Sequence, residues 1–208
     1  MAITKNIGTL SEQLKLVAQT EDADAAVALL LRPMNDDFDV LVVKSVNSPR
    51  DPWSGQIGLP GGKRESKDAD LKHTIIRETL EETAINLEDR CRFLGTLKTQ
   101  CSNHKPEMNI IPFVILLEHG PTIRLNEKEL EKFTWIPLKE LAKHRETARF
   151  SFGESPAYVI DNYVIWGLTY RIIEELLRII GKQGDSCKPR PLSRRQSARS
   201  LRNLSIIS

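Results

Sequence analysis

The chain has 208 residues, 40% of them hydrophobic and 28% charged, and a net charge of +2, which fits one main globular domain rather than two independent cores. No apolar run reaches the roughly 18 to 20 residues of a membrane helix, and residues 1–15 lack the basic start and apolar stretch of a signal peptide, so a cytoplasmic protein is expected. The three cysteines, Cys91, Cys101 and Cys187, lack paired spacing, which argues against a disulfide framework and a zinc finger.

The first predicted elements are a short helix and two neighbouring strands. Residues 8–19 have the apolar spacing of an amphipathic helix. A continuous apolar run at residues 25–33, the turn signal MNDDF and a second run at residues 39–46 predict two adjacent strands. Residues 47–62 are rich in Pro, Gly and Ser, which predicts a long loop with at most a short strand at its end. Long loops inside compact domains often carry function.

The next element is a helix predicted over residues 68–85. At about 100° per residue, one side collects its apolar and small residues, which are Leu71, Ile75, Ile76, Thr79, Leu80 and Thr83. Glu78, Glu81 and Glu82 fall within an arc of roughly 100° on the other, exposed side. Like charges at this spacing repel by a few tenths of a kcal/mol per pair. Either water screens these carboxylates or a cation offsets their repulsion.

Three strands and two helices are predicted after this helix. The strands are residues 90–100, 109–118 and 132–137, and the helices are residues 137–144 and 166–180. Strands therefore dominate the middle of the chain, with helices on either side. This order indicates a mixed β-sheet between helices, without an internal repeat.

The chain is expected to end in a flexible basic tail. From Lys182 onward there are seven Lys or Arg and one Asp, a balance of +6 that leaves −4 on residues 1–181. A short basic tail without interleaved aromatic side chains is usually only solvated, so neither nucleic acid nor a membrane is an expected partner. The predicted organisation is an N-terminal helical extension (residues 1–23), a main domain (24–181) and this tail (182–208).

The acidic turn and the glycines before it suggest a metal site. Glu78 and Glu82 are four residues apart on one helical face, with Glu81 beside them. A Glu-rich helical turn is most often only a solvated face. Gly61 and Gly62, however, permit a close backbone approach that can fold the loop over the start of the helix. Clustered carboxylates with a backbone oxygen favour Mg²⁺ or Mn²⁺ over zinc. Because Mg²⁺ often completes its shell with phosphate oxygens, the implied substrate carries phosphate.

The stretch GGKRESKDADLKHTIIRETLEETAI resembles the Nudix box, which runs from Gly through an acidic residue to an Arg-Glu and a Glu-Glu pair. The matching positions are Gly62, Asp68, Arg77, Glu78, Glu81, Glu82, Ala84 and Ile85. The chain departs from the pattern in having Asp68 for Glu, eight rather than seven residues between Asp68 and Arg77, and Ala84 for Gly. Thr79 also stands where a bulkier apolar residue is usual. Both pairs are intact, so metal binding is expected to survive, whereas a catalytic role of Asp68 is not expected.

The longer spacing resembles the coenzyme A pyrophosphatase branch of the Nudix hydrolases. Other segments are similar to that branch and extend the resemblance over about residues 24–180: RDPWSGQIGLPGGKRE, IIPFVILL, NEKELEKFTWIPLKEL and IWGLTYRIIEELL. A departure is the segment of residues 51–55, which follows Arg50 before the loop resumes the form of the family. The resemblance implies an α/β fold, the Nudix α/β/α sandwich, and a small-molecule nucleotide substrate, and it leaves a homodimer as an alternative to a monomer.

The resemblance also implies roles for the residues of the box. The reaction would be water attack at a phosphorus of a nucleoside diphosphate linked to another group. Glu78 and Glu82 are the implied metal ligands, helped by Glu81 and the carbonyl of Gly61. Arg77 is implied to orient a Glu of the box through a charge-assisted hydrogen bond.

The general base and the substrate contacts are less specified by the resemblance. Glu81 is the candidate base within the box, and Glu127 and Glu129 are the alternatives, because related enzymes often bring a remote Glu to the metal. The substrate-binding candidates are two cations for phosphate groups and one aromatic side chain for stacking on a base: Arg50, Lys63 and Trp53.

The expected function is a metal-dependent hydrolase that cleaves the diphosphate linkage of coenzyme A or a similar nucleoside diphosphate derivative. The alternatives are a pyrophosphatase for ADP-ribose or another such derivative, and a Nudix module that binds a nucleotide without cleaving it. The complete Arg-Glu and Glu-Glu pairs favour the enzyme, because a binding module does not need every metal carboxylate. A P-loop is excluded, since Ile57 stands where Walker A needs Gly and Arg64 where it needs Ser or Thr.

Overall fold

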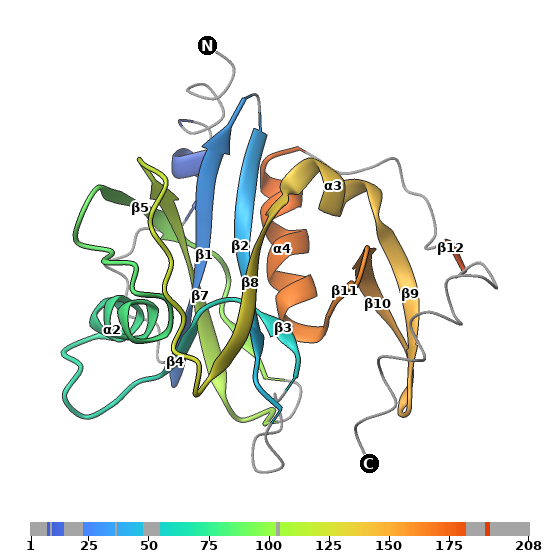
Figure 1. Ribbon diagram of the computed structural model, residues 1–208, viewed down its shortest axis with the longest axis horizontal. Helices are drawn as coiled ribbons and strands as arrows, with labels where there is room; N and C mark the ends of the chain where they lie inside the picture. The colour runs from blue at the N-terminus through green and yellow to red at the C-terminus, as the bar shows by residue number, and fades with distance from the viewer. Residues whose placement is uncertain are drawn as a thin grey trace.

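A computed structural model describes residues 8, 10–14, 23–35, 37–47, 55–102, 105–181 and 190–191. A mixed β-sheet stands between helix α2 (Leu71–Thr83) on one face and helix α4 (Gly167–Ile179) on the other (Figure 1). The predicted α/β sandwich, with its sheet between helices, is confirmed. Among the described residues, no helix has the length and apolar character that crossing a membrane requires.

The main sheet has eight strands in the order β3-β2-β1-β7-β5, with β4 paired to β1, β6 to β7 and β8 to β2. The pairing of β1 with β7 is parallel and the others are antiparallel. The strands are β1 (Ala25–Met34), β2 (Asp37–Ser45), β3 (Ile57–Gly58), β4 (Gly61–Lys63), β5 (Cys91–Thr96), β6 (Gln100–Cys101), β7 (Asn109–Leu117) and β8 (Leu130–Pro137).

Strand β1 is buried on both faces, which explains its continuous apolar sequence. Successive side chains of a strand point to opposite faces of the sheet. Leu29 and Leu31 belong to the hydrophobic cluster that contains Ile172 of α4. Leu30 belongs to the cluster that contains Ile75 of α2. A strand between two helical layers has no polar face and therefore shows no alternation.

Helix α2 is capped at both ends by local sequence. The Asp70 carboxylate accepts a hydrogen bond from the His73 amide at 2.8 Å, which satisfies one of the free N–H groups of the first turn. The helix ends at Ala84, which has a left-handed conformation with φ of 59°. This conformation favours glycine, which accounts for the Gly that the Nudix pattern usually has at this position.

The buried face of α2 differs from the predicted one. Leu80 is 47% exposed, although it was assigned to the apolar side. Glu78 and Glu82 lie within about 20° of Leu71 around the helix, and the Glu78 side chain is only 16% exposed. The prediction that both carboxylates occupy the exposed side is therefore wrong. They point toward the protein, whereas Glu81, with a 51% exposed side chain, does face solvent.

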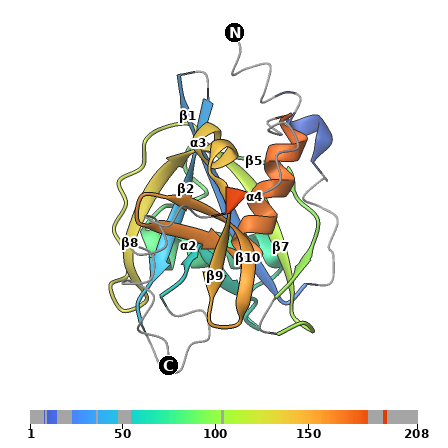
Figure 2. The ribbon, with the colours of Figure 1, turned by 90° about the vertical axis from the view of Figure 1, so that its right-hand side faces the viewer.

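A second sheet, which the sequence analysis did not predict, lies on the other side of α4 from the main sheet (Figure 1) and faces the viewer in Figure 2. It consists of β9 (Arg145–Phe150), β10 (Gly153–Ile160), β11 (Tyr163–Trp166) and the short β12 (Arg190–Pro191), and it follows helix α3 (Leu138–Lys143). The Tyr158 hydroxyl of β10 donates to the Glu174 carboxylate of α4, which also accepts from Arg145 Nε at 2.6 Å. This network ties the second sheet to α4.

The ends and the long loop are described only in part. The predicted N-terminal helix is seen at residues 8 and 10–13, and Leu10 and Leu14 are buried in the cluster on the α4 side. The loop predicted over residues 47–62 contains two short strands, β3 and β4, rather than at most one. Residues 48–54 and almost all of the predicted tail lie outside the described residues. The proposed domain boundaries stay predictions.

Replacing Thr79 by Val is expected to raise the free energy of unfolding by about 1 kcal/mol. Thr79 is fully buried, and within the described part of the chain its hydroxyl has no hydrogen-bond partner. The matched control is Thr83→Val, because the Thr83 hydroxyl donates to the Thr79 carbonyl at 2.6 Å and its removal should destabilise the protein. Urea denaturation followed by circular dichroism measures both changes. A less stable Thr79→Val variant would show that the hydroxyl is satisfied in solution.

Candidate active site

Two consecutive glycines hold β4 against β1 on one side and against α2 on the other. A Cβ atom at Gly61, which has φ of +145°, would overlap the carbonyl oxygen of Ala26 and lie 2.7 Å from the Cα of Val27. A Cβ atom at Gly62 would lie 2.5 Å from the Glu78 carboxylate. Real Cβ atoms do not approach other atoms so closely. Gly61 is therefore needed for the contact with β1 and Gly62 for the contact with Glu78.

Glu82 occupies a half-buried position under the same turn. The Gly61 amide donates a hydrogen bond to Glu82 Oε2 at 2.9 Å. Burial, with the nearby carboxylates of Glu78 and Glu129, raises the pKa of Glu82 to about 8, against the lowering effect of that amide. Burial also raises the pKa of Glu78. These carboxylates therefore hold negative charge at a free-energy cost that a cation between them would relieve.

Arg77 links the turn to the acidic helix. Its guanidinium donates to Glu78 Oε1 at 2.9 Å, to Glu81 Oε2 at 3.1 Å and to the Lys63 carbonyl at 3.1 Å. The side chains of Arg77 and Glu78 are 13% and 16% exposed, so their contact is shielded from most of the solvent, whereas Glu81 is 51% exposed. The contact with Glu78 has the geometry that an orienting role requires. That role itself stays a prediction.

Asp68 anchors Arg77, a contribution that the sequence analysis did not assign. Its two carboxylate oxygens accept from Arg77 Nε at 3.0 Å and Nη2 at 2.9 Å, and the Thr74 hydroxyl donates to it at 3.0 Å. The hydrogen bonds from Arg77 hold the pKa of Asp68 well below its usual range, although burial opposes them. An ionised carboxylate that accepts two hydrogen bonds from a guanidinium is suited to positioning that guanidinium and not to accepting a proton.

Of the two remote candidates for a base, the structure brings Glu129 to the carboxylates. The loop before β8 docks on the end of α2, where the Asn126 amide donates to the Glu82 carbonyl at 2.9 Å. Glu129 contributes to the raised pKa of both Glu78 and Glu82, so its charge lies near them. Asn126 Nδ2 donates to Glu129 Oε1 at 3.1 Å and helps to hold it there. Glu127, in the same loop, is exposed.

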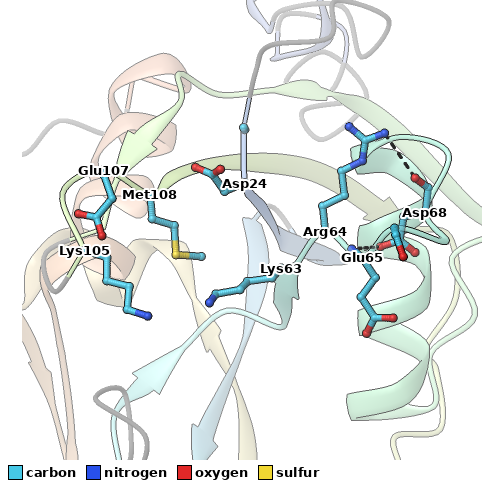
Figure 3. Close-up of a pocket in the computed structure, with 10 residues that line it drawn as sticks. Asp24, Lys63, Arg64, Glu65, Asp68, Lys105, Glu107 and Met108 are labelled. Atoms are coloured by element: carbon cyan, nitrogen blue, oxygen red, sulfur yellow. Dashed lines mark hydrogen bonds between the residues drawn. The ribbon is translucent and has the colours of Figure 1, made fainter.

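The remaining predicted site residues are only partly placed. Lys63 is exposed and lines a hollow beside the turn (Figure 3). Arg50 and Trp53 lie outside the described residues. In the described ranges, no group of three or more His, Cys, Asp or Glu side chains has the arrangement of a preformed metal site. At Gly61 the observed contact is made by the amide, and the predicted metal contact of its carbonyl stays a prediction.

The chain matches the family model of the NUDIX domain over residues 22–154, which is more than half of its length. The chain belongs to the NUDIX family. The glycine turn, Arg77 and the acidic helix described above lie within the matched NUDIX segment.

Relatives found by sequence match only part of this chain. The chain is 35% identical over 123 residues to the uncharacterized protein C14C4.10c of Schizosaccharomyces pombe, which covers 57% of this chain and 37% of that protein. It is 32% identical over 139 residues to the peroxisomal coenzyme A diphosphatase ndx-8 of Caenorhabditis elegans, and the match covers 64% of this chain and 56% of that protein. It is 26% identical over 137 residues to the mitochondrial coenzyme A diphosphatase NUDT8 of Homo sapiens, and the match covers 61% of this chain and 56% of that protein. The match thus spans about half or less of each relative's length.

Solved structures support the NUDIX fold. The crystal structure of the Nudix hydrolase RenU from M. smegmatis superposes with a TM-score of 0.53 at 14% sequence identity, covering 80% of this chain and 90% of that one. At this identity the likeness concerns the fold alone. The α/β architecture inferred from the order of strands and helices is the one that this NUDIX structure shares.

Proposed function

We propose that this NUDIX protein is a metal-dependent hydrolase that cleaves the diphosphate linkage of coenzyme A or a similar nucleoside diphosphate derivative. The observation that carries the proposal is the pair of half-buried carboxylates, Glu78 and Glu82, held under the Gly61–Gly62 turn. The names of two relatives, both coenzyme A diphosphatases, support the substrate class. An anionic substrate needs a cation at such an acidic site, which is why the proposal includes a metal.

Mg²⁺ or Mn²⁺ fits the chemistry of this donor set. Hard divalent cations prefer carboxylate and carbonyl oxygens, and the site offers Glu82, whose pKa is raised by burial and, to a smaller extent, by the neighbouring carboxylates. Glu78 and Glu82 would hold the ion, and Glu81 and the Gly61 carbonyl are the further proposed ligands. When bound, the cation would supply positive charge against the diphosphate and activate water for attack at phosphorus.

The residues around the carboxylates have separate proposed tasks. Asp68 fixes Arg77, and Arg77 in turn fixes Glu78 through the contact of 2.9 Å. The Gly61 amide fixes Glu82. Glu81 is the proposed general base that takes a proton from the attacking water, and Glu129 is the second candidate for this task, because its charge acts on the same carboxylates.

A substrate panel tests this function. The purified protein, with Mg²⁺ or Mn²⁺, is incubated with coenzyme A, ADP-ribose and NADH, and the products are separated by chromatography. We expect coenzyme A to be cleaved fastest, to 4′-phosphopantetheine and adenosine 3′,5′-bisphosphate, with no cleavage in EDTA. Faster cleavage of ADP-ribose or NADH would favour the alternative pyrophosphatase. Binding of all three compounds without cleavage would favour the non-catalytic module and overturn the proposal.

Three wider expectations from the sequence remain proposals. We propose a cytoplasmic location, although one relative is named peroxisomal and another mitochondrial. Imaging of the tagged protein tests this location. We also retain the division into residues 1–23, 24–181 and 182–208, and a homodimer as the alternative to a monomer, which sedimentation distinguishes.

A further inference from the structure

A hollow of about 670 Å³ lies beside the glycine turn, on the far side of β4 from Glu78. Gly62 faces the Glu78 carboxylate, so the side chain of the next residue, Lys63, points to the opposite side of the strand. Lys63 lines the hollow together with Lys105 and Met108 from the loop between β6 and β7 (Figure 3). This volume lies within the range of sites for small ligands, roughly 300 to 1,000 Å³.

Asp68 and the backbone of Lys63 lie between the hollow and the acidic helix α2. Asp68 lines the hollow and is also the anchor of Arg77, which contacts Glu78 and Glu81. The Lys63 carbonyl accepts a hydrogen bond from the same guanidinium at 3.1 Å. One short segment of backbone therefore separates the hollow from the carboxylates.

Two lysines reach into the hollow from different elements, Lys63 from β4 and Lys105 from the facing loop (Figure 3). Most of the carboxylates that line it are already engaged. Asp24 accepts from the Asn109 amide at 2.8 Å, and Asp68 is ion-paired with Arg77. Glu65 forms an ion pair of 3.1 Å with Lys67, and Glu107 is the remaining acid of the lining.

We propose that Lys63 and Lys105 bind a phosphate monoester that the substrate carries in addition to its diphosphate. The inference rests on the proposed function, because coenzyme A has such a group on its ribose. A lysine ammonium donates up to three hydrogen bonds and suits a phosphate dianion as a point charge. Glu107 and Asp24, which keeps its negative charge when it accepts from an amide, oppose this binding by like charge and limit its strength. The hollow thereby distinguishes substrates with the extra phosphate from those without it.

The test compares coenzyme A with dephospho-coenzyme A, which lacks that phosphate. Lys105→Met is expected to lower the ratio of kcat/KM for coenzyme A to kcat/KM for dephospho-coenzyme A by about tenfold. Glu107→Gln should raise the same ratio, by about threefold, because it removes an opposing charge at an exposed site. Lys143→Met, which changes an exposed lysine of α3, is the matched control and should leave the ratio at the wild-type value.

An equal effect of Lys105→Met on both substrates, or a ratio that does not fall, would overturn the inference. If the wild-type protein cleaves neither substrate, the proposed function fails, and calorimetry decides the binding site separately. The titrants are then adenosine 3′,5′-bisphosphate and AMP. We expect tighter binding of the bisphosphate to the wild type, and loss of this preference in Lys105→Met. Equal affinities of the wild type for both titrants would contradict the site.

Discussion

Replacing Glu82 by Gln is expected to lower kcat by about a thousandfold while the protein stays folded. The change keeps the size of the side chain and leaves an amide oxygen that can accept from the Gly61 amide, at 2.9 Å in the structure. It removes one of the charges on which cation binding depends. It also removes a carboxyl group whose pKa is raised by burial and by the nearby Glu78, so the cost of burying a charge disappears and the melting temperature should be equal to the wild-type value or higher. Steady-state kinetics and thermal melting measure both quantities.

A second glutamate close to the end of α2 provides the control for this prediction. Glu88 is exposed, and Glu88→Gln should leave both kcat and the affinity for Mn²⁺ unchanged. Direct titration with Mn²⁺ should show weaker binding to Glu82→Gln than to the wild type. A Glu82→Gln variant that keeps its rate and its Mn²⁺ affinity would refute the assignment of this residue as a metal ligand.

The sequence was sufficient to find the acidic pair but not the direction in which it points. Spacing along the chain places Glu78 and Glu82 on one helical face. The position of that face relative to the protein depends on what covers it, and here Gly62 makes room for the Glu78 carboxylate because it has no Cβ. A count of apolar side chains omits such a backbone contact. For this reason the sequence analysis placed Leu80 on the apolar side of the helix and Glu78 on the exposed side.

The contact between Asp68 and Arg77 could not be predicted from the longer spacing between them. Asp68 precedes the first residue of α2, and the Asp68 amide bonds to the Glu65 carbonyl at 3.0 Å in a turn. Such a turn can absorb one more residue without moving its ends apart. The two-pronged ion pair with Arg77 therefore forms in spite of the insertion. Residue counts across a turn do not measure distance.

The second sheet was missed partly because β9 carries little apolar signal; residues 157–166, AYVIDNYVIW, do favour a hairpin, and the sequence analysis did not use that signal. Only Ala148 is buried in β9, and only Ala157 and Tyr158 are buried in β10. With so few fully buried residues, β9 and the first half of β10 show no clear alternation of apolar and polar side chains. By contrast, β1 and β7 are buried along most of their length, and their apolar runs predicted them directly.

Replacing Gly62 by Ala is expected to lower kcat by about a hundredfold and to change the free energy of unfolding by less than about 1 kcal/mol. The new Cβ would lie 2.5 Å from the Glu78 carboxylate, which is the far end of a flexible side chain and can swing away. The protein then folds, but Glu78 leaves its place beside Arg77. Kinetics and urea denaturation of the same preparation separate the two effects. Full activity of Gly62→Ala would show that catalysis does not need Glu78 against the backbone.

Replacing the neighbouring glycine should have the opposite effect, a loss of stability, which makes Gly61→Ala the matched comparison. Its Cβ would meet only backbone, the Ala26 carbonyl and the Cα of Val27 at 2.7 Å, at a φ of +145° that alanine rarely adopts. Backbone cannot swing aside, so the pairing of β4 with β1 must open. We expect a loss of about 2 to 4 kcal/mol in the free energy of unfolding. A Gly61→Ala protein as stable as the wild type would mean that β4 does not need this close approach, and the position of Glu82 under the turn would need another explanation.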